Sequence, residues 1–190
     1  MSLLTREMAI GAHAWFVREG DAFAAGLDVN GGALGAGAVS KTAIPVANDA
    51  SWIDMGVIEE WEDDVKDEEK ETWAPTPGHL VRNRVIVVKQ SLTCKLTTNQ
   101  LTALAVETFY RSKALTPASF QFNPLSNVPK DGFLKVQRYS EEDTLILSGD
   151  LYCQLKVIGG MKGGSGNLIL PQFQAAILNS VLNSMAMGSE

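Results

Sequence analysis

The pattern that most restricts the fold is an alternation of apolar and polar residues over residues 143–158. One parity holds seven positions that are apolar or glycine: Leu145, Leu147, Gly149, Leu151, Cys153, Leu155 and Val157. Asp150, Gln154 and Lys156 occupy the other parity. A period of two over this length is typical of a β-strand with one buried face. The chain is therefore expected to build its core from strands, with Gly149 as a candidate bulge or bend.

Other segments carry weaker signals of the same kind. Strands are predicted over residues 12–18, 52–61, 84–96, 132–139 and 167–178. One amphipathic helix is predicted over about 98–112, because Thr97 and Gln100 fit a capping box ahead of an apolar face. These elements together predict a mainly β fold, an antiparallel barrel or sandwich with one short packed helix.

The 190 residues suit a single domain over 1–190 with long appendages. Residues 20–50 are rich in glycine and alanine and are predicted to form a long loop. Residues 52–96 are predicted to form one long hairpin around a turn that contains two prolines and a glycine. Residues 179–190 are small and polar, and a flexible C-terminal arm is expected there.

Negative charge is concentrated in residues 59–71, which read EEWEDDVKDEEKE. This segment holds nine acids and two lysines, a net charge of −7. The other residues carry fourteen bases and thirteen acids, a net of +1, so the formal −6 of the chain is a local feature. Trp52, Trp61 and Trp73 flank or interrupt the run. Disordered acidic segments are poor in aromatic residues, so an ordered element that assembly with another chain partly buries is expected.

No residue pattern indicates catalysis, a metal site or a cofactor. His13, His79, Cys94 and Cys153 have none of the spacings of metal sites, and both cysteines fall on the apolar parity of their strands, so they are expected in the core. The acids have oxygen ligands of the type calcium uses, but the spacing fits no calcium loop. Neither glycine-rich stretch matches a nucleotide-binding motif. A protein that is not an enzyme and holds no cofactor is expected.

The composition also limits partners and location. The acidic balance argues against tight nucleic-acid binding, which requires clustered Lys and Arg. No window approaches eighteen uninterrupted apolar residues, so no membrane span is expected. No basic region precedes an apolar run and a small-residue cleavage site at the start of the chain, so folding in a cytoplasm is expected.

The order of these features resembles the tail tube proteins, or major tail proteins, of tailed bacteriophages and prophages. The resemblance rests on a short first strand, a glycine-rich stretch, the sequence WIDMGVIEE at residues 52–60, the acidic strand, a Pro-Gly turn, and TTNQ at residues 97–100 before a short helix. It implies six-copy rings that stack into a tube, and four strands per subunit that join a continuous inner barrel. It also implies a virion protein made in the host cytoplasm, whose other partners are the tape measure, terminator and distal tail proteins.

In such a tube the acids gain a physical role. Double-stranded DNA passes through without specific binding, and an acidic lumen repels its phosphates where a basic lumen would trap them. One parity of the acidic strand, Glu60, Glu62 and Asp64, is expected to face the lumen. Contacts between subunits or rings are expected from a larger set: Trp52, Trp61, Asp67, Glu68, Glu69, Trp73, Arg82 and Arg84.

Other functions remain open on sequence alone. A tail-completion ring or a tube protein of a type VI secretion system would share the fold. A monomeric β-sandwich binding module would use the tryptophan and acid segment as its ligand site. A hydrolase with paired carboxylates is a further alternative.

Overall fold

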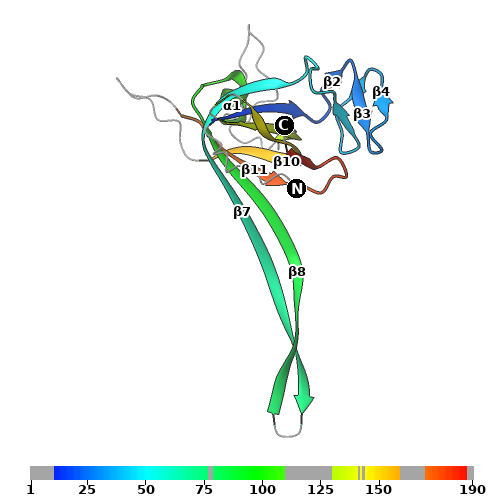
Figure 1. Ribbon diagram of the computed structural model, residues 1–190, viewed down its shortest axis with the longest axis vertical. Coiled ribbons are helices and arrows are strands. Elements are labelled where there is room, and N and C mark those ends of the chain that lie inside the picture. Colours follow the sequence, from blue (N-terminus) through cyan, green and yellow to red (C-terminus); the bar gives the residue numbers. More distant parts are fainter. Residues whose placement is uncertain are drawn as a thin grey trace.

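A computed structural model describes residues 11–76, 79–109, 130–140, 142, 144–158 and 170–187. These residues form a body of short and medium strands from which one long two-stranded hairpin projects (Figure 1). All the pairings between strands are antiparallel. The mainly β class with one short helix is confirmed.

Six strands of the body close into a barrel. They are β1 (Gly11–Arg18), β7 (Ile53–Thr76), β8 (His79–Thr98), β9 (Lys130–Tyr139), β10 (Leu145–Ile158) and β11 (Gln172–Ile177). Their order is β11-β8-β7-β1-β9-β10, and a second pairing joins β10 back to β11. Closure pairs the edges that an open sheet would leave exposed.

The barrel encloses the larger of two apolar cores. Alternate residues of each strand point inward, such as Phe16 of β1, Leu134 of β9 and Phe173 of β11. Cys94 and Cys153 are buried in this core as free thiols, which confirms their expected place. Burial raises the pKa of both thiols. In β10 the predicted buried parity holds from Gly149 to Leu155, but the irregularity lies between Leu145 and Leu147.

A second core lies between the outer side of the barrel and residues 20–50. Val17, Phe133 and Tyr152 of the barrel strands pack against Phe23 and the other apolar residues of this segment, Val39 and Ile44. The segment is not the long loop that its composition predicts. It carries β2 (Ala22–Phe23), β3 (Gly26–Asp28), β4 (Ala33–Leu34), β5 (Gly37–Ala38) and β6 (Ala43–Pro45), arranged as a two-stranded sheet β2-β5 and a three-stranded sheet β4-β3-β6.

Asp49 fastens the small sheets to the start of the hairpin. Its Oδ1 accepts a hydrogen bond from the Ser51 backbone N–H at 2.9 Å, and its Oδ2 accepts from those of Ala24 and Ala25 at 2.9 and 3.2 Å. The Ser51 backbone hydrogen bond is the main reason that the Asp49 pKa falls to about 2. The Asp49 carboxylate therefore accepts hydrogen bonds from three backbone N–H groups. Without it, these groups of a short, irregular segment would bond only to water.

The C-terminal tail is partly ordered rather than a free arm. Residues 184–187 form β12 (Ser184–Met187), which pairs with the first half of β10, while β11 pairs with the second half. Asn183 anchors the entry to β12, because its Oδ1 accepts from the Tyr152 N–H at 2.6 Å and its Nδ2 donates to the Leu178 carbonyl at 2.8 Å. Residues 188–190 of the predicted arm lie outside the described residues.

The helix is shorter than predicted and begins at a different cap. Helix α1 spans Ala103–Phe109, and the predicted residues 110–112 lie outside the described ones. Thr102 caps it, since its hydroxyl accepts from the Ala105 N–H at 3.3 Å. Thr97 is instead paired in β8. The helix packs Leu104 and Ala105 into the barrel core, and its buried Glu107 forms an ion pair with Arg18 at the end of β1.

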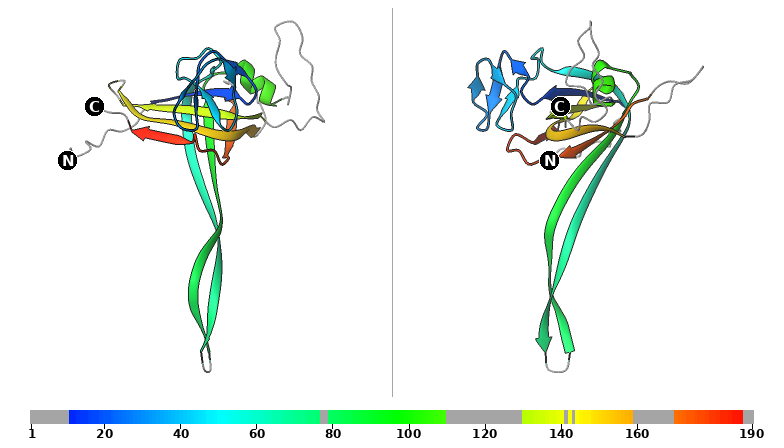
Figure 2. Two further views of the ribbon diagram at one scale, coloured as in Figure 1. Left: turned by 90° about the vertical axis from the view of Figure 1, so that its right-hand side faces the viewer. Right: turned by 180° about the vertical axis from the view of Figure 1, so that it is seen from behind.

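Strands β7 and β8 form the long hairpin that was predicted over 52–96. Only their inner ends belong to the barrel. β1 pairs with residues 53–58 of β7, and β11 pairs with residues 93–97 of β8. The rest, residues 59–76 and 79–92, extends away from the body as a twisted ribbon, here called the arm (Figures 1 and 2).

A glycine of β9 that pairs with the end of β1 gives a test of the barrel packing. A Cβ added to Gly132 would lie 2.0 Å from the Val17 carbonyl oxygen, a backbone atom that cannot rotate away. Gly132→Ala is expected to lower the free energy of unfolding by about 1–3 kcal/mol, measured by chemical denaturation. Gly35→Ala is the matched control because a Cβ there meets nothing within 4 Å. Equal stability of the two variants would contradict this packing.

Candidate functional site

The arm is distinguished from the body by its backbone edges. No described strand pairs with the outer edge of β7 beyond Ile58, or with that of β8 before Thr93. Two long rows of backbone N–H and C=O groups therefore have no partner strand in the described part of the chain. A two-stranded ribbon alone is at best marginally stable in water, and an unpaired edge is a template for pairing with another chain. Unpaired edges of this length are typical of strands that pair with another chain.

The pairing register gives the arm two different faces. From Glu60 to Thr76 the alternation of β7 is unbroken, because the two register shifts in this stretch insert their extra residues in β8. Odd-numbered β7 residues share the side of Trp61, which packs against the barrel core. Even-numbered residues from Glu60 onward lie on the opposite side. The odd side is called the apolar face and the even side the charged face.

The charged face holds the three acids expected to line a lumen. Glu62 forms an ion pair with Lys95 at 2.9 Å, and Asp64 with Lys66 at 3.0 Å. Farther along the arm, Glu68 and Lys89 pair at 3.2 Å. Each of these exposed pairs contributes little to stability, about 0–1 kcal/mol. Their main effect is on the net charge of this face. Acids and lysines nearly balance there, so the face is less negative than the sequence of residues 59–71 suggests.

The apolar face continues the barrel core out into solvent. Near the body, Trp61 and Leu92 pack against buried core residues. Farther out, Val65 is 58% exposed and Trp73 is 53% exposed. Val85 and Val87 of β8 are also exposed, and the register places them opposite Glu71 and Glu69 on the same side. These apolar side chains alternate with three acids on the same side, Asp67, Glu69 and Glu71. Exposed apolar side chains gathered on one side of a projecting ribbon are typical of an interaction surface.

At the root of the arm, Trp61 is held by charge as well as by packing. The Arg138 guanidinium lies 5.1 Å from the centre of the Trp61 ring, and it forms an ion pair with Asp63 at 3.6 Å. Asp63 is next to Trp61 along the apolar face and lies opposite Cys94. Since Arg138 belongs to β9, these contacts tie the first residues of the arm to the far side of the barrel.

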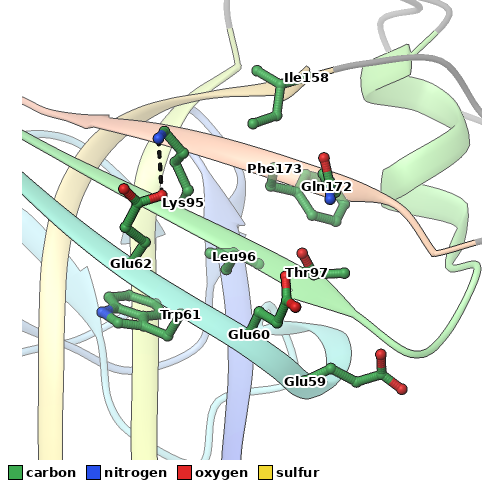
Figure 3. A pocket seen from close by; sticks show the side chains of 10 residues that line it. All are labelled: Glu59, Glu60, Trp61, Glu62, Lys95, Leu96, Thr97, Ile158, Gln172 and Phe173. Carbon is green, nitrogen blue, oxygen red and sulfur yellow. Dashed lines mark hydrogen bonds and ion pairs between the residues drawn. The ribbon is translucent and has the colours of Figure 1, made fainter.

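A groove of about 750 Å³ opens where the arm leaves the barrel (Figure 3). This root groove is lined by residues of β7, β8, β10 and β11: Glu59, Glu60, Trp61, Glu62, Lys95, Leu96, Thr97, Ile158, Gln172 and Phe173. Figure 3 shows the Trp61 and Glu62 side chains on opposite sides of β7. Lys95 pairs with Glu62, whereas no ion pair is found for Glu59 or Glu60 among the described residues.

The other predicted contact residues are spread over the molecule. Trp52 lies in the body, where its ring lies 4.0 Å from the Lys135 ammonium and its Nε1 donates to the Val46 carbonyl at 3.0 Å. Asp67 and Glu69 lie on the apolar face, and Glu68 lies on the charged face. Trp73 lies near the outer end of the arm. Arg82 and Arg84 belong to β8 there, with side chains outside the described part of the structure.

Sequence reasoning did not predict several features that shape this site. Lys89 and Lys95 pair with acids of their own chain, Glu68 and Glu62, across the two strands, which only the register reveals. Val85 and Val87 sit in an apolar run that fitted an ordinary strand. Ile158 and Gln172 reach the root groove because the barrel closes between β10 and β11.

Two negative findings apply to the described residues. In these ranges no helix is long and apolar enough to cross a membrane. The same ranges contain no group of three or more His, Cys, Asp or Glu side chains placed to hold a metal ion. The extended strand explains the second finding, because it separates successive carboxylates onto opposite faces.

The root contacts lead to a prediction about arm attachment. Arg138→Met removes the guanidinium beside Trp61 and the ion pair with Asp63, and is expected to lower the free energy of unfolding by about 1–2 kcal/mol. Lys66→Met, which removes only an exposed pair with Asp64, is the control and is expected to change it by less than about 0.5 kcal/mol. Thermal or chemical unfolding checks both, and equal effects would show that Arg138 does not hold the root.

The sequence was also compared with known proteins. No family model matches it, and no curated protein matches it.

Proposed function

We propose that this chain is a structural subunit that self-assembles into stacked hexameric rings, as the tail tube proteins of tailed bacteriophages do, and forms a conduit through which DNA passes. The observation that carries the proposal is the arm. Its two open edges and its exposed apolar face are unfavourable in an isolated chain and become favourable when neighbouring copies cover them.

A second feature that supports a tube is a polar sheet on the body. Strands β7, β8, β11 and β10 are successive neighbours, and their outward residues form rows across all four strands. One row is Glu62, Lys95, Gln174 and Lys156, and the next is Glu60, Thr97, Gln172 and Ile158. Four adjacent strands with a mostly polar outer side suit the inner wall of a ring in which each subunit supplies four strands.

The charge on this sheet suits a passage for DNA. A third row contains Asp64, Thr93, Ala176 and Gln154. The three rows together hold three acids, Glu60, Glu62 and Asp64, and two lysines, Lys95 and Lys156, a net charge of −1. Clustered bases would bind phosphates through counterion release. A slightly negative surface rich in glutamine and threonine does not, so a duplex is expected to slide along it.

Assembly is tested directly by imaging the concentrated protein. The wild type is expected to form rings or tubes in negative-stain micrographs and large species in sedimentation velocity. Val87→Lys, at an exposed position on the apolar face, is expected to abolish them without unfolding the body. Val181→Lys makes the same change at a body position that is 74% exposed and is expected to assemble normally. A wild-type protein that stays monomeric at every concentration would rule out the proposal.

The lumen assignment has its own test. Tubes that carry Glu60→Lys, Glu62→Lys and Asp64→Lys together are expected to retain a fluorescent DNA duplex on sedimentation at about 50 mM salt and to release it near 200 mM. Wild-type tubes and tubes with the three uncharged amides at the same positions are expected to retain none. Lysine tubes that form normally and leave the duplex in solution would show that this face does not line the channel.

A monomeric binding module is the second candidate, and the root groove is the observation that favours it. Its volume of about 750 Å³ is within the range of small-molecule sites, and Trp61 is among its lining residues. A ligand in this groove would change tryptophan fluorescence in a protein that sediments as a monomer, an outcome opposite to tube formation.

A further inference from the structure

We infer that Asn30 is a site of spontaneous covalent modification, at which the folded chain converts the asparagine into aspartate and isoaspartate through a succinimide. The site lies in the turn between β3 and β4, at the side of the body and away from the arm (Figure 1). The inference is independent of the proposed assembly. It rests on the residue that follows Asn30, the freedom of its side chain and the geometry of the turn.

Asn30 is the one asparagine of this sequence that a glycine follows. The sequence contains nine asparagines, and the others precede Asp, Arg, Gln, Pro, Val, Leu or Ser. Succinimide formation requires the backbone nitrogen of the next residue to approach the side-chain carbonyl carbon of the asparagine. A side chain on that next residue obstructs the approach, and glycine has none. The space here is also open, because a Cβ added to Gly31 would meet no atom within 4 Å beyond its chain neighbours.

The turn requires this glycine, so the reactive pair is built into the fold. Gly31 has a φ of 74°, a backbone conformation that other residues rarely adopt. The Asp28 carboxylate fixes the turn, since its Oδ1 accepts from the backbone N–H groups of Asn30 at 2.8 Å and Gly32 at 2.7 Å. A turn that ends in a glycine at positive φ is a common connection between antiparallel strands.

The Asn30 side chain is free to rotate toward the attacking nitrogen. Asn30 is exposed, and no hydrogen bond to its side-chain amide is found among the described residues. The Gly31 N–H, whose nitrogen attacks, donates to the Asp28 carbonyl at 3.0 Å. Loss of this hydrogen bond before the attack slows the reaction by about fivefold. The folded turn therefore gives Asn30 little protection.

Asn183 has the opposite arrangement and provides a comparison within the same chain. Its Oδ1 accepts from the Tyr152 N–H at 2.6 Å, and its Nδ2 donates to the Leu178 carbonyl at 2.8 Å. Both hydrogen bonds must break before the side-chain carbonyl can turn toward the next residue, which slows the reaction by about thirtyfold. Folding is therefore expected to protect Asn183 and to leave Asn30 reactive.

The reaction needs no partner other than water. The Gly31 nitrogen forms a bond with the Asn30 side-chain carbonyl carbon and loses its proton, and the side-chain nitrogen leaves as ammonia. Water then opens the succinimide at either of its two carbonyls. Opening at the side-chain carbonyl leaves aspartate. Opening at the main-chain carbonyl leaves isoaspartate, in which the main chain passes through the former side chain and is longer by one carbon.

Both products change the turn. Each adds a carboxylate close to that of Asp28, and the two like charges repel. Isoaspartate also lengthens the main chain before Gly31, so the geometry that places the Gly31 N–H on the Asp28 carbonyl is lost. Strand β3 also pairs with β6, whose Ile44 belongs to the second core. The modified hairpin is therefore expected to loosen at its tip while it stays attached to the body.

Ageing of the full chain tests the inference. Wild-type protein is incubated near neutral pH, both folded and unfolded in urea, and is then cleaved after arginine and lysine. The fragment of residues 19–41 contains Asn30 as its only asparagine. Mass spectrometry and enzymatic methylation of isoaspartate are expected to show conversion of Asn30 in the folded protein within about fivefold of its rate in urea. Asn183 is expected to convert at least about thirtyfold more slowly when folded.

Asn30→Gln is the matched control variant. It keeps an uncharged amide at the same exposed position, but its side chain is longer by one methylene, so the succinimide cannot form. No isoaspartate is expected in residues 19–41 of this variant. The same fragment contains Asp21 and Asp28, so isoaspartate that persists in Asn30→Gln would come from an aspartate and would contradict the assignment to Asn30.

Two further outcomes would overturn the inference. If folding protects Asn30 as strongly as it protects Asn183, the turn shields the side chain. If residues 19–41 of the aged wild type contain new aspartate without isoaspartate, the amide is hydrolysed directly and no succinimide forms. Imaging of the concentrated protein decides the assembly proposal separately, so failure of one proposal is distinguishable from failure of the other.

Discussion

An antiparallel ladder that extends beyond its neighbours is the constraint on which the structure depends. β7 and β8 continue to pair with each other beyond the ends of β1 and β11, and in the described ranges neither outer edge of the ribbon pairs with a further strand. Its backbone groups must pair with water or with another chain, and an isolated ribbon gains too little from burial to be stable. This extension exposes the charge pairs and the valines of the arm to solvent and places the root groove at its base.

The body supplies a rigid base for the arm. Barrel closure between β10 and β11 fixes the inner end of β8, and β1 fixes that of β7. The core inside the barrel is reinforced by the second core outside it, where Phe133 and Tyr152 pack against the small sheets. Burial on both sides of β9 explains why its strand shows little alternation, in contrast to β10.

The sequence predicts the parts of this fold that have a period. The alternation in residues 149–155, the antiparallel pairing of the two strands of the hairpin and the burial of both cysteines agree with the prediction. Strands of two or three residues have no measurable period, so residues 20–50 read as a loop although Phe23 and Ile44 anchor them to the barrel. Thr97 looked like a helix cap because its pairing partners in β7 and β11 are far away in the sequence.

For the candidate site, the sequence predicts which side chains share a face, but not their partners or the groove. Strand alternation separates Glu60, Glu62 and Asp64 from Trp61, and the structure places them on opposite faces as expected. Their neutralisation by Lys66 and Lys95 depends on side-chain geometry and register, which composition does not contain. The root groove depends on barrel closure between strands distant in the sequence, so no local pattern indicates it.

The continuity of β7 and β8 from the arm into the barrel has a mechanical consequence. Ladder hydrogen bonds lie perpendicular to their strands. Tension on the outer end of the arm therefore acts along β7 and β8 and loads their bonds to β1 and β11 in shear, all at once, rather than peeling them apart singly. In a subunit attached to a neighbour through its arm, stretching of the assembly would load all of these ladder bonds together, which is the arrangement in which a sheet resists force best.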